Sequence, residues 1–254
     1  MPTLTTPPLA AILARLFADA EATDAVLEQR NANLSQEERT RLLTSATGYQ
    51  ALYSQMKDIH LAVSRETGTL LYMLARAIRA RCIVEFGTSF GISTLHLAAA
   101  LRDNGGGLLI GTEFEPSKVV RARENLIAAG LSDLAEIREG DALQTLAHDL
   151  PETIDLVLLD GAKALYPGIL SLIEARLRAG ALVIADNAAY SPDYLVRVRS
   201  STGGYLSIPF GDDVELSMRL GEPSAARSSF VQFPITGDLE VGQGGVKLTG
   251  NART

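Results

Sequence analysis

The sequence predicts an α/β protein whose core is a doubly wound, Rossmann-like sheet, mostly parallel, with an antiparallel hairpin at one edge. Three observations predict it. Short apolar runs of strand length alternate with helical segments from Arg81 onward, which is the pattern of strands joined by crossover helices. Glycines follow the first such strand at Gly87 and two of the helices at Gly130 and Gly180, where a left-handed backbone ends an element. Two more strand-like runs then occur within residues 205–220 without a helix between them.

The first third of the chain is predicted to be helical. Apolar residues recur at helical spacing over 9–17 and again over 67–80. Between these stripes, residues 35–38 read Ser-Gln-Glu-Glu, the form of a capping box that begins another helix. We expect residues 1–75 to be an N-terminal helical segment that forms a lid and a dimerisation face.

Strands and helices then alternate up to the edge hairpin. The expected strands are 82–86, 108–112, 135–137, 155–159, 181–185, 205–208 and 214–220. The expected helices cover 95–101, 116–129 and roughly 165–178. In this prediction residues 76–220 are the core domain. Residues 221–254 are a partly flexible C-terminal extension with one further strand-like run at 230–233.

Composition excludes several classes of protein. With 254 residues and 46% hydrophobic content, the chain can build one domain with a substantial core. A formal net charge of −7 argues against nucleic acid as a partner. No apolar stretch reaches the roughly 20 residues of a membrane span, and the N-terminus lacks the basic region of a signal peptide. With Cys82 as the single cysteine, no intrachain disulfide can form. We expect a cytoplasmic protein without a membrane partner.

The turn after the first predicted strand has three interpretations. Residues 87–91 read Gly-Thr-Ser-Phe-Gly, which fits the nucleophile elbow of hydrolases. That fold also needs an acid and a late histidine, and the histidines after Ser89 are only His96 and His148, neither at a suitable position. An NAD-dependent oxidoreductase would carry G-x-G-x-x-G, which the turn lacks, although this class stays open. The third interpretation is a site for S-adenosylmethionine.

S-adenosylmethionine has no phosphate, so its turn need not approach a pyrophosphate. It does need a carboxylate at the end of the next strand to accept both ribose hydroxyls, and Glu113 stands there. A further group after the following strand would meet the adenine, and residues 139–142 stand there with two acids. Three such elements on three successive strands favour this cofactor over a chance placement of strand-end acids and turn glycines.

Oxygen-bearing side chains also follow the fourth and fifth predicted strands. Asp160 ends the fourth strand, and Asp186 and Asn187 end the fifth. The carboxyl ends of parallel strands form the ligand crevice of such a sheet, so these side chains are expected near the cofactor. Three oxygen donors without cysteine or histidine suit Mg²⁺, with Mn²⁺ or Ca²⁺ as substitutes. The alternative is that the aspartates are strand-end caps and that Lys163 is a solvated charge.

Together these motifs resemble the cation-dependent O-methyltransferases, the catechol and caffeoyl-CoA O-methyltransferase family of class I S-adenosylmethionine-dependent methyltransferases. The resemblance runs from about residue 62 to residue 220. Its motifs are E-F-G-T-S-F-G-I-S (85–93), T-E-F-E-P (112–116), the D-x-x-K-x-x-Y pattern (160–166) and the Asp-Asn pair (186–187). The implied fold is the methyltransferase version of the Rossmann-like sheet.

The resemblance implies a role for each matching residue. The residues that would hold the methionine and ribose portions of the cofactor are Glu85, Gly87, Ser93 and Glu113, with Val63 contacting it from above. Those near the adenine would be Asp141 and Ala142. The metal ligands would be Asp160, Asp186 and Asn187, and Asp160 would also border the cofactor. Lys163 would be the catalytic general base.

The implied reaction is methyl transfer to a hydroxyl of a small aromatic molecule, an ortho-dihydroxy compound held by a divalent cation. The apolar stripes of the N-terminal helices, in addition, predict a homodimer. Two departures from the family leave the acceptor open. The chain has no tryptophan, and no acid near residues 205–213 can be assigned to the second hydroxyl. The alternatives are a metal-independent N- or O-methyltransferase of the same fold, a non-catalytic S-adenosylmethionine-binding protein, and the NAD-dependent oxidoreductase.

Overall fold

The computed structural model describes residues 1–254 except 33, 46, 212, 222–238, 243–244 and 249–254. The chain divides into two compact units, residues 1–222 and 223–254, and each is described by itself. In the second unit, β8 (Leu239–Gly242) and β9 (Gly245–Leu248) form an antiparallel pair. The strand predicted at 230–233 lies outside the described residues.

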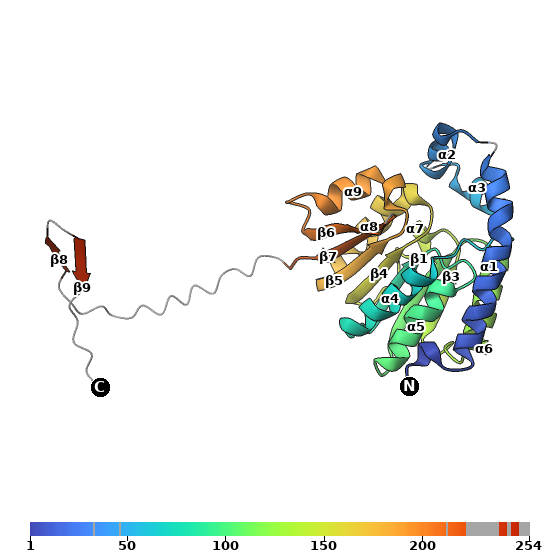
Figure 1. The fold of residues 1–254 in the computed structure, drawn as a ribbon, viewed down its shortest axis with the longest axis horizontal. Helices are drawn as coiled ribbons and strands as arrows, with labels where there is room; N and C mark the ends of the chain where they lie inside the picture. The colour runs from blue at the N-terminus through green and yellow to red at the C-terminus, as the bar shows by residue number, and fades with distance from the viewer. Residues whose placement is uncertain (33, 46, 212, 222–238, 243–244, 249–254) are drawn as a thin grey trace. The chain divides into compact units, whose positions relative to one another are not determined.

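A seven-stranded sheet with the order β3-β2-β1-β4-β5-β7-β6 is the centre of the first unit (Figure 1). Its strands are β1 (Cys82–Phe86), β2 (Leu108–Glu113), β3 (Ala135–Glu139), β4 (Ile154–Leu159), β5 (Leu177–Ala185), β6 (Tyr205–Phe210) and β7 (Val214–Arg219). Strands β1 to β5 are parallel, β7 pairs antiparallel with β5, and β6 completes the edge hairpin. The predicted fold class is confirmed.

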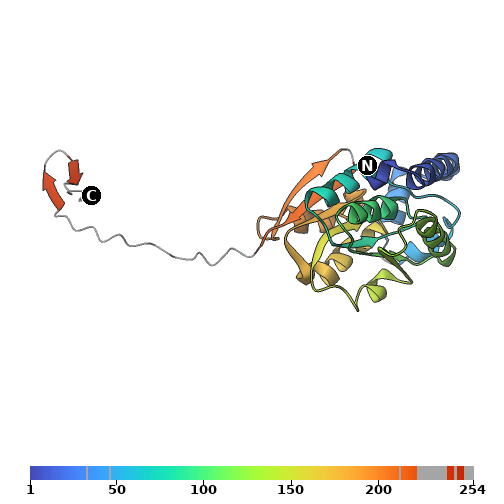
Figure 2. The ribbon, with the colours of Figure 1, turned by 90° about the horizontal axis from the view of Figure 1, so that it is seen from below.

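Helices cover both faces of this sheet (Figures 1 and 2). The α-helices are α1 (Leu9–Ala32), α2 (Gln36–Leu43), α3 (Tyr49–Ser54), α4 (Arg65–Ala77), α5 (Ile92–Asp103), α6 (Pro116–Ala128), α7 (Ala142–Thr145), α8 (Tyr166–Ile173) and α9 (Pro192–Arg199). Short 3-10 helices are η1 (Thr3–Thr5), η2 (Lys163–Leu165), η3 (Glu174–Arg176) and η4 (Ala188–Tyr190). Of the helices that the structure describes, none is long and apolar enough to cross a bilayer.

The central strands β1, β2, β4 and β5 divide their side chains between two apolar cores. In β1, Ile83 packs with helices α4, α5 and α6, whereas Val84 and Phe86 pack with α7, α8 and α9. Successive strand residues point to opposite faces, and helices cover both faces here. The strands are therefore nearly continuous apolar runs, which explains why their positions could be predicted closely.

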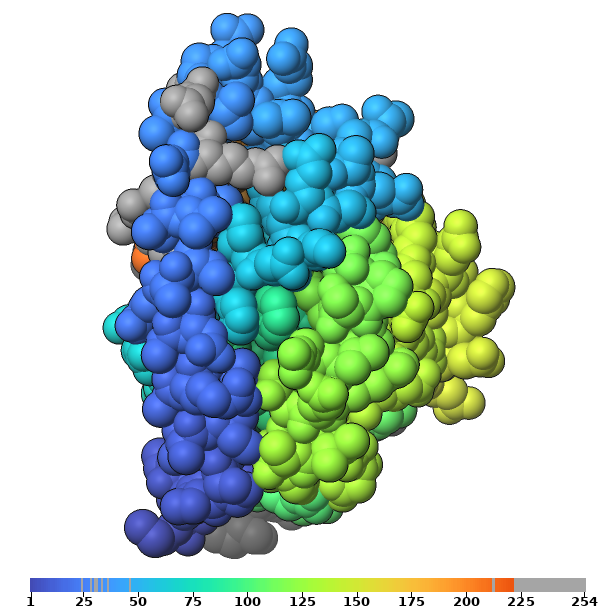
Figure 3. Space-filling model, turned by 90° about the vertical axis from the view of Figure 1, so that its right-hand side faces the viewer, coloured from blue at the N-terminus to red at the C-terminus, as the bar shows by residue number. Residues whose placement is uncertain are grey.

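The apolar stripe of α1 is covered within the chain. Leu9, Leu13, Leu16 and Phe17 are buried in the same core as α5, and α1 lies beside α6 on this flank of the molecule (Figure 3). The homodimer was expected because such stripes need a partner surface, and it stays a prediction. Helix α2 begins at the predicted capping box, with Ser35 as the N-cap.

The helix predicted over 165–178 is shorter in the structure. Helix α8 ends at Ile173, and after η3 the chain enters β5 at Leu177, which pairs with Ile154 of β4. The register between these strands then shifts, and Gly180 has a positive φ of 78° that a glycine adopts without strain. The irregular start of β5 therefore replaces the last part of the expected helix.

Candidate active site

The turn after β1 is built around a glycine that lets two neighbouring strand ends come together. Gly87 has a φ of 100°, and a Cβ atom there would lie 2.7 Å from the backbone of Asp160. The N–H groups of Gly87 and Thr88 both donate to the carbonyl of Thr112 near the end of β2, at 3.2 and 3.0 Å. The turn is thus fixed between β2 and β4, and only glycine fits its first position.

Glu85 lies under this turn with its carboxylate fully buried. It accepts hydrogen bonds from the hydroxyls of Thr88 at 2.8 Å, Ser93 at 2.6 Å and Thr94 at 2.5 Å. Burial raises the pKa of Glu85 to about 7, although the three hydroxyls act in the opposite direction. Glu85 lies behind the walls of the two cavities that border the turn. Its hydrogen bonds therefore hold the turn and Ser93 in place.

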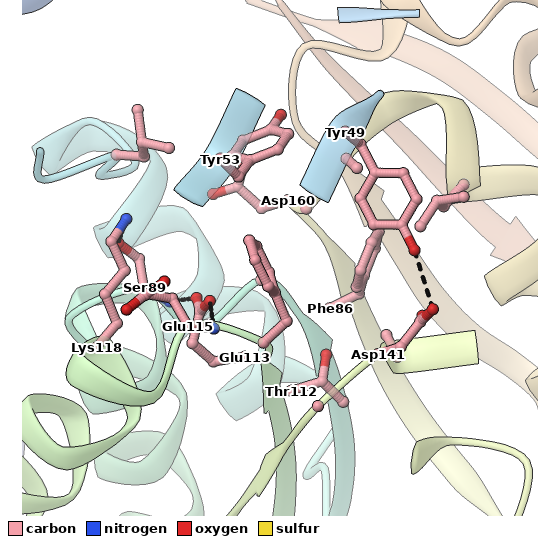
Figure 4. A pocket seen from close by; sticks show the side chains of 18 residues that line it. Tyr49, Tyr53, Phe86, Ser89, Thr112, Glu113, Glu115, Lys118, Asp141 and Asp160 are labelled. Carbon is pink, nitrogen blue, oxygen red and sulfur yellow. Dashed lines mark hydrogen bonds between the residues drawn. The ribbon is translucent and has the colours of Figure 1, made fainter. Parts of the chain in front are cut away.

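The carboxylate of Glu113, at the end of β2, is oriented by two backbone groups. The N–H of Ser89 donates to one oxygen at 2.8 Å, and the N–H of Glu115 donates to the other at 2.9 Å (Figure 4). Lys118 lies beside them on α6 and is only 3% exposed. Burial lowers the pKa of Lys118, although the charges of Glu113 and Glu115 oppose that shift. Glu113 therefore presents a fixed acceptor to the cleft.

Asp141 connects the sheet to the N-terminal helices. As the N-cap of α7, it accepts a hydrogen bond from the N–H of Leu143 at 2.9 Å. Its other oxygen accepts from the hydroxyl of Tyr49 on α3, also at 2.9 Å (Figure 4). Ala142 follows as the first residue of α7 and is buried. The acid expected near the adenine thus also contacts a helix far away in the sequence.

These groups face one open cleft of about 640 Å³. The expected cofactor residues on its wall are Gly87, Glu113, Asp141, Ala142 and Asp160. A smaller cavity of about 220 Å³ is lined by Val63 and Ser93 and shares Leu61 and Ser89 with the cleft. Of the residues predicted to touch the cofactor, Glu85 alone therefore lies behind the walls.

The expected metal ligands meet at the ends of β4 and β5. The N–H of Asp160 donates to the carbonyl of Phe86 in β1 at 2.8 Å, and the N–H of Asp186 donates to that of Leu159 in β4 at 2.9 Å. The backbone of each aspartate therefore continues the hydrogen bonding of the sheet. Asn187 has a left-handed backbone with a φ of 48°. Its amide nitrogen donates to the carboxylate of Asp213 at 3.2 Å. This contact engages the nitrogen of the Asn187 amide and leaves its oxygen to act as a metal ligand.

The charges of this cluster suit a divalent cation. Burial and the nearby carboxylate of Asp160 raise the pKa of Asp186 to about 8, because two acids this close cannot both ionise easily. A hard cation would relieve that repulsion, and carboxylate and amide oxygens are ligands that Mg²⁺ accepts. Among the described residues, no group of three or more His, Cys, Asp and Glu side chains could hold a metal. The set therefore depends on the amide of Asn187 as its third donor.

Lys163 lies in the same cluster and is 5% exposed. Its Nζ is 3.0 Å from an oxygen of Asp160 and 3.8 Å from one of Asp186. Burial disfavours the charge of this side chain, but Tyr166 and the two carboxylates outweigh it, and the pKa of Lys163 is raised well above its ordinary value. In the chain alone, Lys163 is therefore an ammonium ion paired with these acids.

Several residues near the reacting groups were missed by sequence reasoning. Tyr53, on α3, lies next to Asp160 (Figure 4) and lines both the cleft and a second cavity that contains Lys163. His60 stacks on Phe90 with 3.8 Å between ring centroids, and its Nδ1 is buried without a hydrogen-bond partner in the described part of the chain. Of these two residues, only Tyr53 could have been found from a sequence pattern, since it stands four residues after Tyr49 and therefore on the same helix face.

The hydrolase interpretation is not supported by this geometry. The ring of His96 is buried in α5, and its Nδ1 lies 2.8 Å from the carbonyl of Ile92. The hydroxyl of Ser89 instead lies 3.4 Å from Nζ of Lys118. A serine nucleophile needs a histidine base within hydrogen-bonding reach.

Comparison with known proteins defines the class of the core. Residues 84–188 match the family described as a methyltransferase domain, a segment that runs from β1 past the predicted metal ligands. This match agrees with the resemblance found in the sequence, as does the similarity of the chain to curated relatives named catechol O-methyltransferase.

Curated relatives of the chain include proteins named catechol O-methyltransferase. The chain is 34% identical over 130 residues to the protein of Niastella koreensis and 35% identical over 127 residues to that of Mycobacterium tuberculosis. Each match covers 50% of this chain and 58% or 57% of the relative. Catechol O-methyltransferase B of Danio rerio is 32% identical over 171 residues, 64% of each chain. The chain thus spans less than two thirds of the length of these relatives.

Solved structures share the fold. The O-methyltransferase TomG from Streptomyces achromogenes, involved in tomaymycin synthesis and solved in complex with SAM, has a TM-score of 0.56 at 26% identity over 80% of this chain and 99% of its own. The cofactor-bound Rv0187 protein from MTB has a TM-score of 0.58 at 26% identity over 77% and 95%. TomG was solved with SAM bound, and Rv0187 with a bound cofactor.

Proposed function

We propose that this protein transfers the methyl group of S-adenosylmethionine to one hydroxyl of a small aromatic acceptor with vicinal hydroxyls, with the help of a divalent cation. One observation carries the proposal. Asp160 lines both the cofactor cleft and the neighbouring cavity that contains Lys163, Asp186 and Asn187. The methyl donor and a metal-bound acceptor would therefore meet at Asp160.

The cleft residues would hold the cofactor in a fixed orientation. Glu113, held by two backbone N–H groups, would accept hydrogen bonds from the two ribose hydroxyls. Asp141 and Ala142 would border the adenine, and Val63 and Ser93 the methionine portion in the smaller cavity. Methyl transfer from a sulfonium is an in-line displacement, so much of the catalysis consists of aligning the two reactants.

The acceptor hydroxyl must lose a proton as its oxygen attacks the methyl carbon. A divalent cation on Asp160, Asp186 and Asn187 would lower the pKa of a bound hydroxyl and neutralise the acids that keep Lys163 charged. Lys163 would then accept the hydroxyl proton. The new bond joins oxygen to the methyl carbon, and the bond from that carbon to sulfur breaks, which leaves S-adenosylhomocysteine as the product.

The test is transfer of labelled methyl from S-adenosylmethionine to a panel of catechols and single phenols, with Mg²⁺ or with excess EDTA. The proposal predicts turnover of catechols that EDTA abolishes. The variants Lys163→Met and Asp186→Asn should lose at least about 100-fold in kcat, while their affinity for S-adenosylhomocysteine stays that of the parent. Lys57→Met, which changes an exposed lysine, is the matched control and should retain full activity.

The other outcomes identify the alternatives. Turnover that EDTA does not change would support the metal-independent methyltransferase. Tight binding of S-adenosylhomocysteine with no turnover of any acceptor would support a non-catalytic binding protein. Preferential binding of NAD would support the oxidoreductase. The homodimer and the cytoplasmic location stay predictions, to be checked by sedimentation and by cell fractionation.

A further inference from the structure

A second cavity borders the proposed cofactor cleft and shares Tyr53, Leu61 and Asp160 with it. Its volume is about 1840 Å³, and it is open to solvent. Asp160, Lys163, Asp186 and Asn187 line one part of it. The part of it that a water-sized sphere can enter measures about 710 Å³, which is within the roughly 300–1,000 Å³ of small-molecule pockets and more than a single catechol ring needs.

The rest of the wall is largely aliphatic and comes from the N-terminal helices. Its apolar members include Leu27 of α1, Leu43 of α2, Leu52 of α3, and Met56 and Leu61 of the segment after α3. These side chains also belong to a small apolar cluster that is separate from the two cores of the sheet. One side of that cluster therefore faces the cavity rather than other protein.

We propose that the acceptor carries an extended apolar group beyond its hydroxyl-bearing ring, and that the aliphatic wall binds this group. The inference rests on the proposed function, because the ring hydroxyls would be held at Asp160 and Asp186. From there the wall of the cavity continues to the aliphatic side chains of the N-terminal segment, so a substituent on the ring would enter this space. A wall of leucine and methionine suits an alkyl chain, because these side chains adapt to irregular apolar shapes.

The charged side chains of the cavity gather mainly at one end, and the aliphatic ones at the other. Its acids and Lys163 lie together at the ends of β4 and β5, whereas the helical N-terminal segment adds one charged residue, Arg39, to the five aliphatic side chains. An acceptor that is polar at one end and apolar at the other would match both parts. A small, uniformly polar acceptor would leave the aliphatic wall in water, which is unfavourable.

The test uses catechol, 4-methylcatechol, 4-butylcatechol and 4-octylcatechol with the whole protein. Binding is measured by calorimetry with S-adenosylhomocysteine and Mg²⁺ present, and methyl transfer is measured separately. The dissociation constant should fall by about fourfold for each buried methylene until the cavity is filled, with kcat nearly unchanged. Leu43→Gln should remove part of that gain for octylcatechol and leave catechol binding unchanged. Val26→Gln, at a side chain 56% exposed on α1 and outside the cavity wall, should leave both unchanged.

The outcomes separate this inference from the proposed function. Methylation of catechols with no effect of chain length on binding would overturn the inference and leave the proposed function standing. Binding that strengthens with chain length, without methylation, would support the inference and contradict the proposed function. If no compound of the series binds or reacts, both are wrong.

Discussion

Tyr49 donates a hydrogen bond of 2.9 Å to Asp141 and so ties helix α3 to the start of α7, across 92 residues of sequence. Asp141 borders the cleft of the methyltransferase domain, and α3 also carries Tyr53. The N-terminal segment is therefore attached to the proposed adenine site itself. Opening of α3 and access to the cleft should be coupled through this contact.

Removal of the Tyr49 hydroxyl should destabilise helix α3. We expect Tyr49→Phe to increase hydrogen exchange of the backbone amides in Tyr49–Ser54, because a hydrogen bond worth about 1 kcal/mol is lost. Exchange in α6 should not change and serves as the internal control. Hydrogen-exchange mass spectrometry of the cofactor-free protein measures both helices. Equal exchange of α3 in the two proteins would contradict the coupling.

Glu85 should make the stability of the protein depend on pH. Burial raises its pKa from 4.5 to about 7 in the folded state, so on unfolding between these pH values the group releases a proton. The free energy of unfolding should therefore fall as pH rises from about 4.5 to 7, by at most about 3 kcal/mol from this residue. Below 4.5 the group is protonated in both states and contributes nothing to this dependence.

The variant Glu85→Gln isolates this contribution. Its free energy of unfolding should rise relative to that of the parent as pH increases from 5 to 8, because glutamine cannot ionise. Urea unfolding with EDTA and without cofactor measures the difference, and the exposed Glu66→Gln is the control. A pH dependence identical in parent and Glu85→Gln would show that Glu85 is ionised throughout this range.

Gly87 should tolerate no side chain. Gly87→Ala adds an unfavourable φ and a Cβ atom 2.7 Å from the backbone of Asp160. Gly106 has a similar φ of 103° with nothing within 4 Å of its Cβ position, so Gly106→Ala measures the backbone cost alone, roughly 1–3 kcal/mol. We expect Gly87→Ala to be the more destabilised variant in urea unfolding and to bind S-adenosylhomocysteine more weakly. Equal loss of stability in the two would mean that the turn relaxes around the added methyl.

Asp213 should position the third proposed metal ligand. Its carboxylate accepts from the amide nitrogen of Asn187 at 3.2 Å, and partners of this kind typically change metal affinity by 10–100-fold. We expect Asp213→Ala to weaken Mn²⁺ binding about tenfold, measured by electron paramagnetic resonance with S-adenosylhomocysteine bound. Its affinity for S-adenosylhomocysteine should stay that of the parent. The control is Asp193→Ala on the exposed side of α9, and the idea fails if both variants bind Mn²⁺ equally well.

The strands of the sheet could be predicted closely because each one corresponds to a short apolar run in the sequence. Strand β1 was expected over the same five residues that form it, since four of the five are apolar, as in a strand buried on both faces. The meeting of Asp160 with Asp186 could also be predicted, because parallel strands bring their carboxyl ends to one edge. The segment between β4 and β5 is less regular than expected, since η2, α8 and η3 replace one helix.

The contacts between the N-terminal segment and the site could not be predicted in the same way. Contacts such as that between Tyr49 and Asp141 join segments that carry no complementary sequence pattern. Asp213 is close to Asn187 only because β7 pairs antiparallel with β5, which brings the turn before β7 back to the end of β5. Such contacts depend on how the elements pack, so no pattern in the sequence selects these residues.

The central claim is that one edge of the sheet holds both S-adenosylmethionine and a divalent cation. A crystal grown with S-adenosylhomocysteine and Mn²⁺, with anomalous diffraction recorded at the manganese edge, tests it most directly. The account predicts the ribose at Glu113, the adenine beside Asp141, and one anomalous peak among Asp160, Asp186 and Asn187. A bound S-adenosylhomocysteine with no manganese at these three residues would contradict the metal-assisted mechanism.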